Sequence, residues 1–249
     1  IVNFSKELGI YEKPNQLLSI SLGSTETTLL KLTSAYSSFI NGGKLIKPII
    51  IDRVQDSEGN TIVNNDKRSC LNCSEISFTS KDYPIIQDQY KQIFSAQTAY
   101  QITSLLEGVV KRGTGKKLRD LKLNLAGKTG TTNKNTDTWF IGFTSNLVIG
   151  VYVGMDDPKP LGKYETGSKV ALPIFKDFVK KGIKKSDARP FKVSDGITMM
   201  VIDPETGQKA KFSSKDTIIE AYKSKNIVDG KIYQLNKNRL VSNNILRFY

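Results

Sequence analysis

The spacing of apolar residues along the chain predicts four helices. They are expected at residues 1–10, 28–40, 96–111 and 167–183. Thr27 and Ser95 stand directly before two of them, where a hydroxyl can accept a hydrogen bond from a free amide of the first turn. Pro173 fits the last helix only near its first turn, because a proline ring deeper inside a helix clashes with the preceding turn.

Runs of β-branched and aromatic residues predict the strands. They are expected at residues 47–54, 61–63, 121–129, 139–144 and 147–153. The first two form one hairpin, and the last two form a second hairpin joined at Ser145-Asn146. Residues 64–89 are largely polar, so we expect an irregular surface loop there.

The composition of the chain shifts near Lys185, which divides it into two predicted parts. Residues 1–185 form the main part, and residues 186–249 form a small β-rich extension. Within the extension we expect a turn at Asp203-Pro204-Glu205-Thr206-Gly207 and a short helix from Asp216 to Lys223.

The composition and net charge limit the classes of protein to which the chain can belong. Hydrophobic residues make up 38% of the 249 residues, and no apolar run reaches the ~18 residues of a spanning helix. The formal charge of +13 favours anionic partners in general. A nucleic-acid-binding protein is an alternative that only the charge suggests. The lysines are scattered and do not alternate with aromatic residues in one patch, as a nucleic-acid-binding surface would require.

The chain contains no histidine, which excludes a Ser-His-Asp or Cys-His catalytic arrangement. Any general base must be a lysine, a carboxylate or a tyrosine. Cys70 and Cys73 form a single Cys-x-x-Cys pair, and zinc would need two further ligands that the chain does not offer as Cys or His. A small disulfide, two free thiols and a redox pair all remain open at this point.

The sharpest local signal is the segment Ala126-Gly127-Lys128-Thr129-Gly130-Thr131-Thr132, placed at the end of a predicted strand. Lys128 and Gly130 share one face of that strand, because side chains alternate. Lysine brings a positive charge, and glycine lets the backbone approach a neighbour or a ligand closely. The hydroxyls and amides that follow can bind a carboxylate.

This segment and its surroundings resemble the class A, bifunctional penicillin-binding proteins. The Lys-Thr-Gly element is one of that family's three active-site motifs, beside Ser-x-x-Lys and Ser-x-Asn. Further matches occur in the family's order along most of the chain. They are Ala35-Tyr36-Ser37-Ser38-Phe39, Gly113-Thr114-Gly115, Asp137-Thr138-Trp139-Phe140, Val151-Tyr152-Val153-Gly154-Met155-Asp156-Asp157 and Asp203-Pro204-Glu205-Thr206-Gly207. Tyr152 stands where tryptophan is often found.

The resemblance implies an α/β fold of the penicillin-binding and β-lactamase type, in which helices flank a five-stranded antiparallel sheet. This chain would supply the Lys-Thr-Gly strand, the hairpin after it and the closing helix, and the fold would be incomplete at its N-terminus. The resemblance also implies a location on the outer, periplasmic face of the cytoplasmic membrane, through an anchor outside this sequence. That compartment would suit a disulfide between Cys70 and Cys73.

The implied chemistry is acyl transfer between peptidoglycan stem peptides, with lipid-linked precursors as substrates and β-lactams as mimics. Lys128, Thr129 and Gly130 would be the catalytic element, and Thr131 and Thr132 would bind the substrate carboxylate. The backbone N–H of Thr131 would contribute to the oxyanion hole. The resemblance implies no metal or organic cofactor and no nucleic-acid partner.

The chain departs from the family in one decisive respect, because it has no Ser-x-x-Lys. The nearest form is Thr28-Leu29-Leu30-Lys31, which opens a predicted helix. Ser224-Lys225-Asn226 and Ser242-Asn243-Asn244 follow the Lys-Thr-Gly element, whereas the family's Ser-x-Asn precedes it. Two explanations fit: part of a longer working enzyme, completed by a missing N-terminal part of the same protein, or a catalytically inactive remnant or wall-binding module.

A fluorescent β-lactam tests directly whether this chain lacks the nucleophilic serine. The 249-residue chain should form no covalent adduct on a denaturing gel, because loss of the nucleophile costs several orders of magnitude in rate. A penicillin-binding protein with its serine intact serves as the positive control. A labelled band that maps to any serine of this chain would contradict the prediction.

Overall fold

The centre of the molecule is a three-stranded antiparallel sheet. The computed structural model describes residues 1–66, 68–71, 73, 83–87, 89–212, 214–228 and 231–232. Within them the sheet has the order β5-β6-β7, formed by Ala126–Thr131, Thr138–Phe143 and Val148–Val153. The hairpin predicted around Ser145-Asn146 is therefore confirmed. The strand predicted at 121–129 is displaced, because Lys116–Leu121 forms the 3-10 turn η2 and pairing begins only at Ala126.

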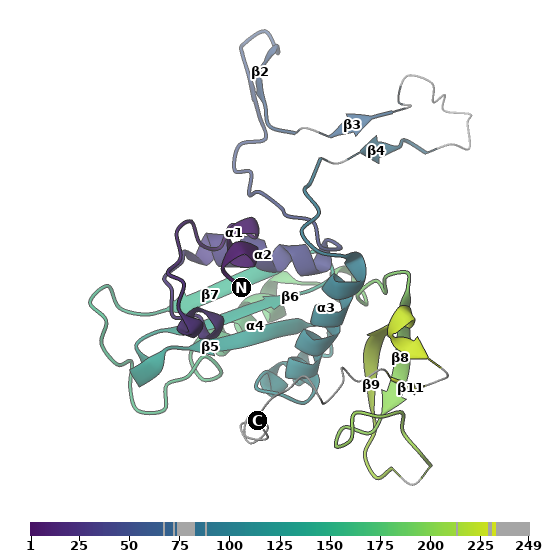
Figure 1. Cartoon of the computed structure of the whole chain (residues 1–249). Coiled ribbons are helices and arrows are strands. Elements are labelled where there is room, and N and C mark those ends of the chain that lie inside the picture. Colours follow the sequence, from purple (N-terminus) through teal and green to yellow (C-terminus); the bar gives the residue numbers. More distant parts are fainter. Residues whose placement is uncertain are drawn as a thin grey trace.

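Helices cover both faces of this sheet. Helices α2 (Leu29–Ile40) and α3 (Ala96–Lys111) contact β7 and β5, and α4 (Ala171–Gly182) contacts β6 and β7. A side chain at Gly150 would collide with Thr33 of α2, whereas one at Gly142 would collide with Phe175 of α4. These two glycines therefore mark opposite faces. Figure 1 shows α4 behind the sheet and α3 crossing its right-hand side.

The helix ends follow local chemistry. The Ser95 hydroxyl accepts a hydrogen bond from the Thr98 amide at 3.2 Å, which confirms the predicted cap of α3. For α2 the predicted cap is wrong by one residue. Thr28 caps the helix, and the Thr27 hydroxyl instead donates to the carbonyl oxygen of Ile10 at 2.8 Å. This long-range bond ties α2 to the segment after α1 (Val2–Glu7) and could not be read locally.

Helix α4 begins at Ala171, four residues later than predicted, because residues 167–170 form turns. Pro173 consequently lies in the first turn, where its missing N–H costs no helical bond. The buried core lies between α4 and the sheet, and the rings of Phe140 and Phe175 meet there at 4.8 Å. Its buried members are Val110, Leu118, Leu125, Phe140, Ala171, Leu172, Phe175 and Val179.

Two hairpins project from the body between α2 and α3 (Figure 1). Strands β1 (Arg53–Gln55) and β2 (Thr61–Asn64) confirm the first predicted hairpin, although its first strand is shorter than expected. The irregular loop predicted at 64–89 is wrong in part, because β3 (Ser69–Cys70) pairs with β4 (Ile86–Gln87). Parts of this segment lie outside the described residues.

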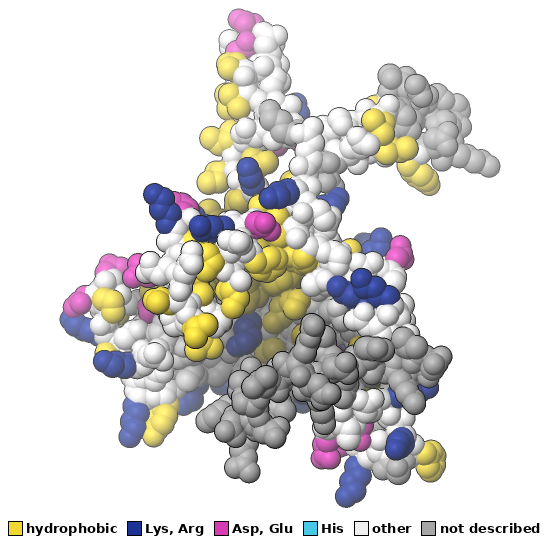
Figure 2. Space-filling view, viewed as in Figure 1, with side chains coloured by type: hydrophobic (Ala, Val, Ile, Leu, Met, Phe, Trp, Pro, Cys, Tyr) yellow, Lys and Arg dark blue, Asp and Glu magenta, His cyan; other side chains and the backbone are white. Residues whose placement is uncertain are grey.

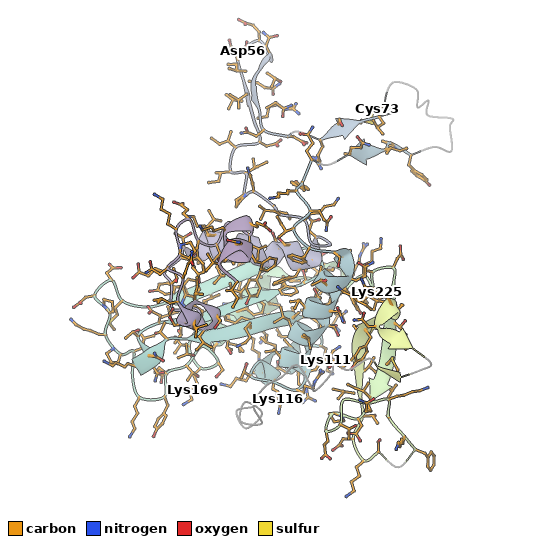
Figure 3. The ribbon with its side chains drawn as sticks, in the orientation of Figure 1. Asp56, Cys73, Lys111, Lys116, Lys169 and Lys225 are labelled. Carbon is orange, nitrogen blue, oxygen red and sulfur yellow. A yellow bond between two sulfur atoms is a disulfide. The ribbon has the colours of Figure 1, made fainter. Side chains whose placement is uncertain are left out.

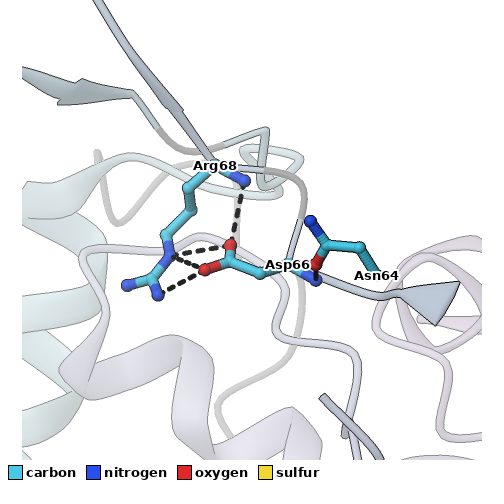
Figure 4. A network of polar contacts seen from close by, with 3 residues as sticks. All are labelled: Asn64, Asp66 and Arg68. Atoms are coloured by element: carbon cyan, nitrogen blue, oxygen red, sulfur yellow. Dashed lines mark hydrogen bonds and ion pairs between the residues drawn. The ribbon is translucent and has the colours of Figure 1, made fainter. Parts of the chain in front are cut away.

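Cys70 and Cys73 form a disulfide within this second hairpin. This is the disulfide that the implied periplasmic location would suit. Figure 3 labels Cys73 there and Asp56 at the tip of the first hairpin. Asp66 turns the chain between the two hairpins. Its carboxylate accepts from the Arg68 guanidinium at 2.6 Å, and its amide donates to Asn64 at 3.0 Å (Figure 4). The Arg68 bonds hold the pKa of Asp66 at about 2.

The C-terminal extension centres on a second antiparallel pair, β8 (Ile197–Ile202) and β9 (Ile218–Lys223). The helix predicted over Asp216–Lys223 is wrong, because Ile218–Lys223 forms β9, which pairs with β8 and docks on α3. Lys223 donates to the Thr98 hydroxyl at 2.6 Å, and Gln101 donates to the Ala221 carbonyl at 3.0 Å. Tertiary contacts thus override a local helical pattern.

The remaining described elements are short. They are the 3-10 turns η1 (Leu18–Leu22), η3 (Asn133–Asn135), η4 (Lys185–Asp187) and η5 (Ser224–Asn226), and the strands β10 (Ile227–Val228) and β11 (Lys231–Ile232). None of the described helices is long and apolar enough to cross a membrane. The predicted division at residue 185 falls within η4 and stays a prediction.

Phe175 offers a direct test of the core. Phe175→Ala should lower the free energy of unfolding by about 3–5 kcal/mol, because it opens a cavity against Phe140 and the sheet. Urea denaturation of both proteins measures the difference. Phe178→Ala on the same helix is the matched control: its ring is 52% exposed, so the loss should stay near 1 kcal/mol. Equal losses in the two variants would contradict this placement of the core.

Candidate active site

The Lys-Thr-Gly element occupies the second half of β5, at the end of the sheet opposite the β6–β7 turn. Lys128 pairs in register with Ile141, and Gly130 pairs with Trp139, so Lys128 and Gly130 share one face as predicted. Gly150 lies on that same face, next to Ile141. This is the α2 side of the sheet.

The open edge of β5 carries backbone groups that do not pair with β6, and the Lys128 ammonium, which could bind a ligand. The Thr132 amide donates to the Asp137 carbonyl at 3.1 Å. Bonding alternates along an antiparallel ladder, so the N–H and C=O groups of Thr129 and Thr131 point away from β6. Among the described residues no strand pairs with that edge. The exposed Lys128 ammonium donates to the Thr129 carbonyl at 2.8 Å, which places its positive charge at the same edge.

Thr129 connects the Lys-Thr-Gly element to the Gly113-Thr114-Gly115 turn. Its hydroxyl lies 3.0 Å from the Thr114 hydroxyl. The turn folds tightly against the end of α3, since a side chain at Gly113 would lie 2.9 Å from the Val109 Cα. The sequence singled out both motifs, and the structure brings them together.

Thr131 is held by a loop that sequence reasoning did not include. Its hydroxyl oxygen accepts a hydrogen bond from the Gly167 amide at 3.0 Å. The hydroxyl proton therefore remains available to donate. Gly167 lies so close that an added side chain would meet the carbonyl oxygens of Gly130 and Trp139 at 2.5 Å. A glycine is thus required where this loop crosses the β5–β6 ladder.

Thr132 belongs to the turn that joins β5 to β6. Its hydroxyl accepts from the Asp137 amide at 2.8 Å and lies 2.7 Å from the Thr136 hydroxyl. Asp137 in turn accepts a bond from the Tyr152 phenol at 2.7 Å. This bond raises the pKa of Tyr152 above its ordinary value, because it favours the protonated phenol.

Trp139 and Tyr152 lie side by side on the face of Lys128, with ring centroids 4.7 Å apart. Asp137, Tyr152 and Gly167 also belong to this candidate site, although the sequence did not predict them as site residues. Trp139 and Tyr152 could have been placed next to Gly130 from the hairpin register alone. Gly167 comes from a distant loop, and no local signal connects it with Thr131.

The other candidate motifs have structural roles. The Thr28 hydroxyl accepts from the Lys31 amide, and the Lys31 ammonium pairs with Glu12 at 2.6 Å, so Thr28-Leu29-Leu30-Lys31 is a helix cap. The Ser224 hydroxyl, at the start of η5, lies 2.8 Å from the Thr198 hydroxyl of β8. Ser242-Asn243-Asn244 lies outside the described residues.

A pocket of about 410 Å³ lies elsewhere, between the ends of α2 and α3 and residues 189–195. Ser145 lines it, so it adjoins the opposite end of the sheet from Thr131. Its other walls include Phe39, Tyr100 and Phe191. In the part of the chain that the structure describes, no three Cys, Asp or Glu side chains gather as metal ligands would.

An antiparallel sheet between helices, with Lys-Thr-Gly on an open edge strand, defines a transpeptidase domain of the penicillin-binding type. The family model for the penicillin-binding protein transpeptidase domain matches residues 6–180. The chain therefore belongs to this family, and over most of its length it is similar to class A members.

Similar proteins of known class show which penicillin-binding proteins the chain resembles. The chain is 42% identical to penicillin-binding protein 1A of Rickettsia felis and 44% identical to that of Rickettsia prowazekii, each over 230 residues. Those alignments cover 91% of this chain and 29% of each relative. The chain thus spans less than a third of the length of these proteins.

Solved structures agree. The crystal structure of penicillin-binding protein 1A from Haemophilus influenzae matches with a TM-score of 0.73 and 27% identity, over 89% of this chain and 36% of that one. PonA1 of Mycobacterium tuberculosis in complex with penicillin V matches with a TM-score of 0.52 and 22% identity, over 72% of this chain and 44% of that one. The second likeness shows the fold alone.

Gly167→Ala tests the contact that holds Thr131. The methyl group would overlap two backbone oxygens, so we expect a loss of roughly 1–3 kcal/mol in unfolding free energy. Trp139 is the only tryptophan, and its emission should shift as the loop moves off the β5–β6 ladder. Gly182→Ala is the control, because its nearest neighbour would be 3.9 Å away. Unchanged emission and stability in Gly167→Ala would refute the contact.

Proposed function

We propose that this chain forms the Lys-Thr-Gly wall of a peptidoglycan D,D-transpeptidase active site. The observation that supports this most directly is the open edge of β5. It carries the Lys128 ammonium, bound to the Thr129 carbonyl, and, two residues further along, the outward N–H of Thr131. The nucleophilic serine and its lysine would come from a part of the domain outside this sequence. The whole protein would be a longer, bifunctional glycosyltransferase and transpeptidase.

The reaction would be acyl transfer. The serine attacks the carbonyl of the D-Ala–D-Ala bond, the terminal D-Ala leaves as its amine takes up a proton, and an amine from a neighbouring stem peptide then displaces the serine. Lys128 would organise the protons and attract the substrate carboxylate. Proton transfer by a positioned group typically contributes about 100-fold or more in rate.

Thr131 would act through two of its groups. Its outward N–H would bind the oxyanion of the tetrahedral intermediate, a contribution of about 3–4 kcal/mol for such a donor. Its hydroxyl accepts from Gly167, which leaves the proton to donate to the terminal carboxylate of the stem peptide. The Thr132 hydroxyl is engaged within its own turn, so we propose that it supports this carboxylate site by shaping the turn.

Exposed apolar surface supports a larger domain. Figure 2 shows apolar side chains gathered on the face viewed in Figure 1 and along the projecting hairpins. Leu18, Leu22 and Ile50 are about nine-tenths exposed. Patches of this kind mark surfaces that contact other protein. The missing N-terminal part of the same protein would cover them, and β-lactams would acylate only the complete enzyme, because the serine lies in that part.

The alternative is a catalytically inactive remnant or wall-binding module of the same fold. The coding sequence immediately upstream of Ile1 separates the two. An in-frame Ser-x-x-Lys and Ser-x-Asn support the enzyme, and a stop codon or frameshift supports the remnant. In either case we place the protein at the periplasmic face of the cytoplasmic membrane.

Lys128→Ala tests the proposed role in the polypeptide that contains this chain and the upstream serine. Acylation by a fluorescent β-lactam should slow roughly 100-fold or more, because the ammonium at the β5 edge is lost. Lys116→Ala is the matched control, since Lys116 is exposed and lies outside the site (labelled in Figure 3). A Lys128→Ala protein that reacts at the unaltered rate would exclude this role.

A further inference from the structure

The turn between β5 and β6 depends on more than its own residues. Lys134 and Asn135 both have positive φ angles, 64° and 54°. The left-handed region costs about 1–2 kcal/mol for a residue with a side chain, although asparagine tolerates it better. Two such residues in succession make a turn that needs support from outside. That turn directly follows Thr131, whose N–H and hydroxyl form the proposed ligand site.

Part of this support comes from the Leu161 amide, which donates to the Asn135 carbonyl at 2.9 Å. Tyr152 adds further support from β7, two strands away. Its phenol donates to the Asp137 carboxylate at 2.7 Å, and the Asp137 amide donates to the Thr132 hydroxyl at 2.8 Å. The Thr132 amide returns a bond to the Asp137 carbonyl at 3.1 Å. Tyr152 therefore reaches both ends of the turn through one residue.

Tyr152 is 42% exposed, and its neighbours on the sheet limit where its ring can lie. The ring contacts Trp139, and an added side chain at Gly130 would meet the Trp139 Cβ at 3.0 Å. At Gly154 an added side chain would lie 2.2 Å from the Tyr152 hydroxyl and 2.6 Å from Asp137 Oδ1. The hydrogen bond thus occupies the space that any other residue at 154 would fill.

We infer that Tyr152 is a positioning residue, which through Asp137 holds the turn at residues 132–137. It thereby places the Thr131 N–H for the oxyanion and the Thr131 hydroxyl for the ligand carboxylate. The role of Thr131 rests on the proposed function. The control of the turn does not, so the two can be tested separately.

Hydrogen exchange in the full 249-residue chain tests the turn. Tyr152→Phe keeps the ring against Trp139 and removes only the hydroxyl, so the Thr132 and Asp137 amides should exchange about fivefold faster or more. Gly154→Ala should reproduce this effect by displacing the same hydroxyl. Tyr164→Phe is the matched control, because that ring is 64% exposed and lies outside the turn. Exchange within twofold of the parent chain in both test variants overturns the inference.

A titration then tests the effect on ligand binding. An N-acetylated Lys-D-Ala-D-Ala peptide is added while Trp139 emission is followed. The parent chain and Tyr164→Phe should bind alike, and the Kd of Tyr152→Phe should rise about fivefold or more. An unchanged Kd in Tyr152→Phe overturns the positioning role even if the turn loosens. If the parent chain shows no binding, the proposed ligand fails, and the exchange rates alone decide whether Tyr152 holds the turn.

Discussion

The register of the β5–β6 ladder is the constraint on which the rest of the structure depends. Pairing Gly130 with Trp139 sends the N–H of Thr131 to the open edge and brings Lys128 onto the α2 side of the sheet. A shift of one residue would exchange the two faces and turn Lys128 toward the α4 core. Trp139 is in turn paired with Tyr152. The strand register therefore sets both the open edge of β5 and the position of Tyr152, which contacts Asp137 in the β5–β6 turn.

Close approaches at glycines preserve this register. Gly142 admits the Phe175 ring, Gly150 admits Thr33, and Gly167 lies on the ladder itself. Each glycine accepts a neighbour from a different element, so α4, α2 and the loop before α4 are all seated against the same three strands. The open edge of β5 therefore lies on a closely packed base, as the oxyanion donor that we propose would require.

Much of the fold and part of the site could be predicted. The α3 cap at Ser95, the Trp139 hairpin and the Lys-Thr-Gly strand all have local causes, namely a hydroxyl before an apolar stripe and β-branched runs between turns. The helix predicted at Asp216–Lys223 fails because that segment pairs with β8 and docks on α3. Its local pattern contained no information about either partner.

The sequence by itself determined which chemistry is present: a lysine and two threonines around a glycine on one strand, without histidine and without Ser-x-x-Lys. Only the tertiary structure decided how those groups are held. Gly167 reaches Thr131 from 36 residues away, and Tyr152 reaches Asp137 from the third strand. Local periodicity reports which face a side chain occupies, whereas these contacts arise from how separate elements pack, and packing depends on the whole chain.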